Sequence, residues 1–244
     1  MELRPEKERG KRWYSLDEIK AELSARLPSG TAFEIPIFGG IPVPQSTVMS
    51  WIIIAVITVL AIWLTHNLKE RPGRRQAVAE LLVGFINNFC RENLGEKHWR
   101  TFAPYLGTVA VYLVVSNTCG LFGFTPPTKD LNVAAALAIM SGVLIYAAQF
   151  KYHGFRGGLK KFASPSAMIT PLNVMEMGIR PLSLCFRLFG NILGAYIIME
   201  LIKIVCPLVL PIPFSLYFDI FDGILQAVVF VFLTTLFLSE SLED

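Results

Sequence analysis

Charge is scarce in this sequence. Only 17% of its 244 residues are Asp, Glu, Lys or Arg, whereas 53% are hydrophobic, and the net charge is +3. A soluble domain of this size is far less apolar, and so small a net charge gives no indication of a nucleic-acid partner. The apolar residues form runs of about 20, the length needed to cross a ~30 Å hydrocarbon core. The composition therefore predicts an integral membrane protein built of helices.

Cysteine and histidine chemistry is also missing. The chain has four cysteines and three histidines, with no CxxC pattern and no Cys/His cluster. We therefore expect no metal, no cofactor and no disulfide framework, and interpret the cysteines as small hydrophobic residues. The first apolar run begins near Val48, too far from Met1 for a cleavable signal peptide. The cysteines concerned are Cys90, Cys119, Cys185 and Cys206.

The fold class predicted is an all-α integral membrane protein with five transmembrane helices, an in-plane amphipathic helix and a long tilted hairpin formed by the last two spans. Residues 1–46 form an extramembrane tail, with a short helix at 16–27 that starts with a capping box. Two extended pieces follow within residues 33–44. Residues 47–244 form the membrane domain, with spans at about 47–66, 105–124, 131–150, 173–206 and 214–239.

Basic residues in the loops give the orientation. The loop after the first span and the loop at 151–161 are rich in Lys and Arg, so the positive-inside rule makes both cytoplasmic. The N-terminus is then outside and the C-terminus inside. Residues 76–93 have one polar and one apolar face, which favours a helix lying in the membrane interface. An ordinary helix packed on a partner is the alternative.

One arginine interrupts the fourth apolar run. Arg187 cannot lose its proton to enter lipid, and its placement at membrane depth costs at least ~2.5–3.5 kcal/mol. The side chain must therefore face protein or water. Residues at helical spacing from Arg187 form one face of this helix, and each of them is polar or small. This face carries Glu176, Arg180, Ser183, Asn191 and Gly194.

The helix that carries Arg187 is long, and its partner carries acids. Residues 173–206 would span about 51 Å at 1.5 Å per residue, more than a ~30 Å core, so the helix must tilt. The last span runs back along it after a proline-rich turn. Its polar positions at i, i+3, i+4 and i+7 are Asp219, Asp222, Gly223 and Gln226.

These two stripes suggest a mechanism. Asp219 and Asp222 would make an acidic path from outside, and Glu176 with Arg180 would make one from inside. A permanent cation between them blocks a continuous cation pore, so an ion would cross on a moving carboxylate that Arg187 attracts when ionised. No acid of this chain lies beside Arg187 at that depth, and we therefore expect the carboxylate to come from a partner subunit.

The run from Arg180 through Arg187 to Asn191 resembles the signature of subunit a of rotary F-type ATP synthases. The resemblance implies a non-catalytic stator subunit of the F0 proton channel, with two offset half-channels and an essential arginine. It further implies as partners a c-subunit ring, the b-subunit peripheral stalk, the remaining F0F1 subunits and membrane lipid, in a cell membrane such as the bacterial inner membrane. By position, Arg187 matches the essential arginine, Asn191 and Gln226 its polar neighbours, and Glu176 an acid of the inner exit path.

Two positions depart from that pattern. Tyr196 stands where many relatives have an acid, with Glu200 one turn later, and Asp219 stands where some have histidine. We assign the outer path to Asp219 and Asp222, with Glu200 as a further candidate. The resemblance leaves H⁺ and Na⁺ undistinguished, because the selective site should belong to the carrier ring.

Other readings of these residues stay open. A helix packing role is the alternative for Asn191 and Gln226, a polar helix end for the two aspartates, and an interface anchor for Arg180. For the whole chain, the rivals are a stand-alone carrier or channel whose Arg187 binds an anion, and a purely structural anchor. We find no inverted repeat, which many carriers have.

Overall fold

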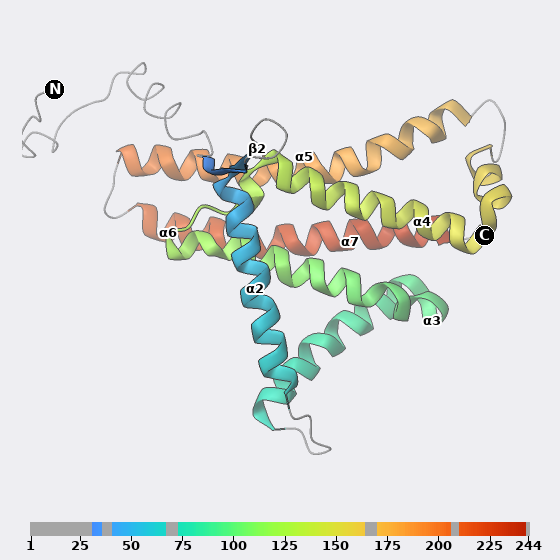
Figure 1. Cartoon of the computed structure of the whole chain (residues 1–244), viewed down its shortest axis with the longest axis horizontal. Helices are drawn as coiled ribbons and strands as arrows, with labels where there is room; N and C mark the ends of the chain where they lie inside the picture. Colours follow the sequence, from blue (N-terminus) through green and yellow to red (C-terminus); the bar gives the residue numbers. More distant parts are fainter. Residues whose placement is uncertain (1–30, 36–40, 67–72, 164–169, 206–209, 243–244) are drawn as a thin grey trace, which may run out of the picture.

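The computed structural model describes residues 31–35, 41–66, 73–163, 170–205 and 210–242. Within them, five helices are long and apolar enough to cross a membrane. A hairpin of two antiparallel strands, β1 (Thr31–Ile35) and β2 (Ile41–Pro44), precedes the first helix (Figure 1). The protein is thus an all-α integral membrane protein with one small β-hairpin. The helix predicted at 16–27 lies outside the described residues.

Helix α2 (Gln45–Thr65) crosses the other helices obliquely (Figure 1). Most of its apolar side chains are exposed, as expected of a helix surrounded by lipid. Its buried residues lie in its first three turns, where hydrogen bonds tie it down. Tyr112 Oη donates to Ser50 Oγ at 3.0 Å, and Ser46 Oγ donates to Asp130 Oδ2.

Helix α3 (Arg74–Thr118) bends sharply at Gly95, whose φ of 70° is in the left-handed region that glycine adopts without strain. The sequence predicts two separate helices here, at 76–93 and 105–124. In the structure the backbone is non-helical at Gly95, which separates two helical segments; the second ends at Thr118, and the 3₁₀ turn η2 (Cys119–Phe122) follows. The break between the two segments thus lies at Gly95, and Pro104 is accommodated inside the second segment.

Helix α4 (Leu131–Ala163) follows the short 3₁₀ turn η3 (Pro127–Lys129). Asp130 caps it, because Asp130 Oδ1 accepts a hydrogen bond from the Asn132 backbone N–H at 3.0 Å. The helical backbone is interrupted at Gly154, with φ of 69°, and a second helical segment forms the rest of the basic stretch that the sequence suggested as a loop.

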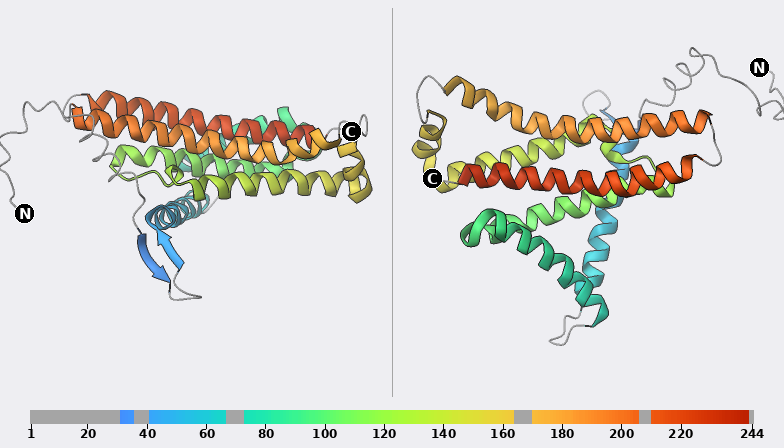
Figure 2. Two further views of the ribbon diagram at one scale, coloured as in Figure 1. Left: turned by 90° about the horizontal axis from the view of Figure 1, so that it is seen from above. Right: turned by 180° about the vertical axis from the view of Figure 1, so that it is seen from behind.

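The last two long helices form the predicted hairpin. Helix α5 (Thr170–Val205) runs in the opposite direction to α6 (Pro211–Ser215), η4 (Leu216–Asp222) and α7 (Gly223–Leu242), which form one continuous rod. Figure 2 shows α4, α5 and α7 side by side along the longest axis of the molecule. The segment η4 is π-helical, an irregularity often found at functional sites.

Leucine and phenylalanine side chains fill the space between α3, α4, α5 and α7. Lipid tails are as apolar as these side chains, so the helices are held together by close packing and hydrogen bonds rather than by the hydrophobic effect. This core fixes the positions of α5 and α7, on which the polar residues lie. Its fully buried members include Leu106, Leu113, Leu184, Leu188, Phe230 and Leu238.

Candidate functional site

The face of α5 around Arg187 is open. Arg187, Ser183 and Asn191 are exposed, and a Cβ added at Gly190 or Gly194 would meet no atom within 4 Å. Among the described residues Arg187 makes no hydrogen bond or ion pair. A guanidinium without a partner among the described residues, beside two small residues, leaves room for an acidic neighbour to approach closely.

Gln226 on α7 is 1% exposed and contacts this face through Asn191. Its Oε1 accepts a hydrogen bond from Asn191 Nδ2 at 2.6 Å. The two residues that the resemblance gives as polar neighbours of Arg187 are thus hydrogen-bonded to each other. The Gln226 Nε2 group is buried and has no hydrogen-bond partner in the described part of the chain, an arrangement that costs about 1–3 kcal/mol.

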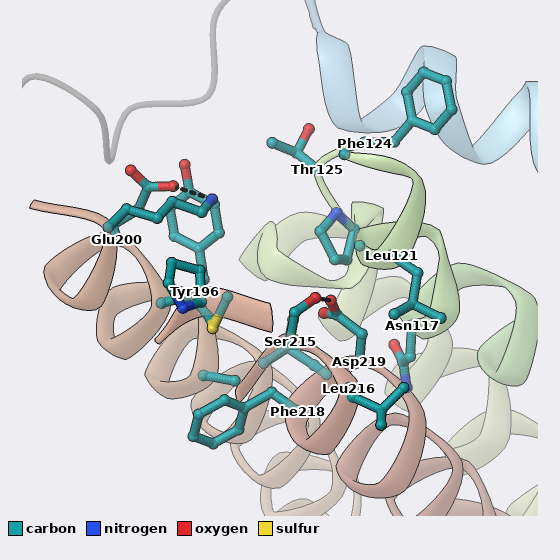
Figure 3. Close-up of a pocket in the computed structure, with 18 of the residues that line it drawn as sticks. Asn117, Leu121, Phe124, Thr125, Tyr196, Glu200, Ser215, Leu216, Phe218 and Asp219 are labelled. Atoms are coloured by element: carbon teal, nitrogen blue, oxygen red, sulfur yellow. Dashed lines mark hydrogen bonds and ion pairs between the residues drawn. The ribbon is translucent and has the colours of Figure 1, made fainter. Parts of the chain in front are cut away.

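A cavity of about 790 Å³ opens between α3, α5 and the α6–η4 segment. Asp219 and Glu200 both line it (Figure 3). Asp219 Oδ2 accepts a hydrogen bond from Ser215 Oγ at 2.6 Å, and Glu200 pairs with Lys203 at 2.9 Å. The structure therefore brings together two of the acids that the sequence suggested for the outer path.

Asp222 is not among the residues that line this cavity. The sequence argument placed it on one face with Asp219, which assumes a regular α-helix. The i→i+5 bonding of the π-helical segment η4 widens the turn, so a spacing of three residues no longer keeps two side chains on one face. Its role in the path stays a prediction.

The contact between α3 and the α6–η4–α7 rod is very close. Asn117 Nδ2 donates to the Gly223 carbonyl at 3.0 Å, and Asn117 Oδ1 accepts from Thr128 Oγ1 at 2.8 Å. A Cβ at Gly223 would lie 2.9 Å from Asn117 Cβ, and one at Gly120 would lie 2.7 Å from Asp219 Cγ. Two glycines thus allow the approach that positions Asp219.

The other end of α5 carries an ion-pair cluster. Arg180 Nη2 lies 2.9 Å from Glu176 Oε1 and 2.6 Å from Glu240 Oε1, and the guanidinium lies over the Phe237 ring. Glu240 was missed in the sequence, although it lies 14 residues after Gln226 and so on the same helical face.

The polar side chains form two groups, one toward each end of α5, with the exposed Arg187 between them. The described part of the chain has no group of His, Cys, Asp and Glu residues arranged to hold a metal ion. Charged groups on both sides of a fixed cation in an apolar helix are typical of a membrane subunit that handles ions.

Comparison with known proteins agrees with this class. Residues 47–239 match the family described as ATP synthase A chain, and the chain belongs to that family. It is therefore a non-catalytic, ion-translocating, multi-pass subunit of the F0 sector, and such a subunit implies a c-subunit ring and other F0F1 subunits as partners.

A curated relative extends the comparison. The chain is 30% identical over 222 residues to the sodium-ion-specific ATP synthase subunit a of Propionigenium modestum. The match covers 84% of this chain and 76% of the relative.

Proposed function

We propose that this subunit provides two offset half-channels that are separated by Arg187, and that ions pass from one to the other on a carboxylate of the c-ring. Ion flow is then coupled to rotation of the ring. The observation that carries this proposal is Arg187 itself, an exposed arginine in an apolar helix beside two glycines that leave open space.

The outer half-channel is the cavity that Asp219 and Glu200 line. Ile192 also lines it, and this residue directly follows Asn191 on α5. Five residues of helix, about 7.5 Å of rise, separate Ile192 from Arg187. The cavity thus extends from the outer end of α5 almost to the level of the arginine, as an entry path ending at the carrier should.

The inner half-channel begins at the cluster of Arg180, Glu176 and Glu240. Arg180 lies two turns from Arg187, about 10.5 Å along the helix and in the direction away from the cavity. The two polar regions are therefore displaced along α5 on opposite sides of one fixed cation. An ion that enters through one region must be carried past the arginine to reach the other.

Arg187 supplies the electrostatics of that step. A permanent positive charge favours the ionised form of a nearby carboxylate, so a ring carboxylate arriving at Arg187 would release its ion. The same charge repels a free cation and prevents leakage. One elementary charge crossing 100 mV releases ~2.3 kcal/mol, which is available to move the ring.

We further propose that the ion is the proton, that the N-terminus is outside and the C-terminus is cytoplasmic, and that residues 76–93 lie in the inner interface of a bacterial cell membrane. The b-subunit peripheral stalk would hold the subunit against rotation. The sodium specificity named for the relative makes Na⁺ the alternative ion. ATP hydrolysis by the purified complex that depends on Na⁺ would replace the proton with sodium in this proposal.

Substitution of Arg187 tests the mechanism directly. Arg187→Ala should abolish ATP-driven ion pumping in membrane vesicles, whereas the detached soluble head should still hydrolyse ATP. Arg100→Ala, which removes an exposed arginine of α3 outside this face, is the matched control and should pump normally. Coupled pumping at the wild-type rate by the Arg187→Ala complex would refute the mechanism.

A further inference from the structure

Lys129, the last residue of η3, is buried beside the outer cavity. The residue is 9% exposed, and its Nζ lies 3.9 Å from the centroid of the Tyr196 ring. Within the described residues the ammonium makes no hydrogen bond or ion pair. A cation over a tyrosine ring gains about 0.5–2 kcal/mol. The tyrosine, a residue that lines the cavity, thus lies between Lys129 and the proposed ion path.

The charges around Lys129 come from two elements. Burial lowers the pKa of the Lys129 ammonium, and the negative charges of Glu200 on α5 and Asp130 at the start of α4 oppose that shift. Asp130 is already bound by Ser46 Oγ from α2 and by the Asn132 backbone N–H. From α3, the neutral Asn117 binds this turn through Thr128.

Glu200 is therefore the acid on which the charge of Lys129 can act. It is 6% exposed, and its other cation, Lys203, has a side chain that is 47% exposed and so is largely screened by solvent.

The burial of Lys129 over the Tyr196 ring, together with the lowered pKa that burial causes, argues against a purely structural lysine. A folded-state pKa below the usual value means that the charged lysine costs folding free energy at neutral pH. This cost is present in full below the folded-state pKa and is lost as the pH rises from there to the usual value. An apolar residue of similar size would fill the same space without the cost. Perturbed ionisable groups of this kind gather at functional sites.

We infer that Lys129 is a positioning residue of the outer half-channel, which holds the Tyr196 ring in the cavity wall and keeps Glu200 ionised. This inference rests on the proposed function. In this arrangement the positive charge of Lys129 on the η3 turn balances the negative charge of Glu200 on α5. Glu200 lies one helical turn beyond Tyr196, and the Lys129 ammonium lies against the ring of that tyrosine. Lys129 acts on the ion only through these two side chains.

The test uses the complete complex and three variants. Lys129→Met removes the charge, Lys129→Arg keeps it, and Lys151→Met removes an exposed lysine that also lies over a tyrosine ring. A carbodiimide with an amine nucleophile labels protonated carboxyl groups, and mass spectrometry of the peptides reports labelling of Glu200 as a function of pH.

Lys129→Met should extend labelling of Glu200 to higher pH, because the loss of a neighbouring positive charge disfavours the ionised carboxylate. Lys129→Arg and Lys151→Met should follow the wild-type curve. An unchanged curve for Lys129→Met in an assembled complex overturns the inference. If Lys129→Met does not assemble, Lys129→Gln gives the same reading.

Transport separates this inference from the proposed function. The pH dependence of ATP-driven pumping should shift in Lys129→Met in the same direction as the labelling. A shift in labelling with an unchanged pumping profile overturns the inference, because Glu200 would then lie outside the path, yet it leaves the arginine mechanism intact. Normal pumping by Arg187→Ala refutes the proposed function alone, since the labelling curve does not depend on it.

Discussion

Replacement of Gly120 with alanine would displace the Asp219 carboxyl group without moving a helix. The added Cβ would lie 2.7 Å from Asp219 Cγ, whereas ordinary contact begins at 3.4 Å. Asp219 Oδ1 lies closer still to the added Cβ, so the carboxyl group must move by at least about 0.7 Å, the difference between these two distances. Because Asp219 can rotate about its side-chain bonds, the backbone need not shift, and an off-rotamer side chain costs about 0.5–1.5 kcal/mol.

That movement should reduce transport while the complex still assembles. The hydrogen bond of 2.6 Å from Ser215 to Asp219 should lengthen and weaken unless Ser215 moves as well. If the full 0.5–1.5 kcal/mol appeared in the transport barrier, ATP-driven pumping would fall by a factor of about 2 to 13. The rate is measured from acidification of inverted vesicles, normalised to the amount of assembled complex.

Two further variants make the result specific. Gly178→Ala adds the same methyl group at a position on α5 where no atom lies within 4 Å, so its pumping rate should equal that of the wild type. In an Asp219→Ala background the clash is absent, and Gly120→Ala should then have no additional effect. Wild-type pumping by the single Gly120→Ala variant would refute the reasoning about the position of Asp219.

Three other substitutions have definite expected outcomes. Asp219→Asn should slow ion translocation in vesicles without preventing assembly, and an unaffected rate would remove Asp219 from the path. Gly223→Ala places a Cβ 2.9 Å from Asn117 Cβ, which cannot rotate away. It should destabilise the subunit by about 1–3 kcal/mol, and undiminished thermal stability of the complex would contradict this close packing. Glu240→Gln breaks one ion pair of Arg180. Because the Glu240 side chain is 58% exposed, the stability of the subunit should change by less than about 1 kcal/mol. Pumping should nevertheless decrease, and a wild-type rate would exclude Glu240 from the inner half-channel.

The membrane helices and the arginine motif could be predicted from the sequence because both depend on local patterns. Runs of apolar residues identify segments that can cross lipid, and five such helices are present in the described part of the chain. The resemblance carried by Arg187 and Asn191 was confirmed by the family match. A helical period of 3.6 residues was enough to group Asn191 with the arginine, because α5 stays helical through that region.

The contacts of the outer cavity could not be predicted, since they join segments far apart in the chain. Lys129 stands beside Asp130 between two predicted spans, and nothing local in the sequence indicates that it lies over the ring of Tyr196. The π-helical segment that contains Asp219 and Asp222 changes the direction in which later side chains point. It contains no proline or glycine that would indicate this irregularity in the sequence. Both features follow from packing between helices, which one-dimensional periodicity does not contain.

The attachment of α2 has a consequence for how the protein fits its bilayer. Hydrogen bonds hold this helix at Ser46 and Ser50, near its N-terminal end, and beyond Ile53 nearly every side chain is exposed. A helix hinged at one end can adjust its slope to the thickness of the surrounding lipid. In a thinner membrane α2 would lean further over from that end, and the packed helices that carry the arginine would keep their alignment.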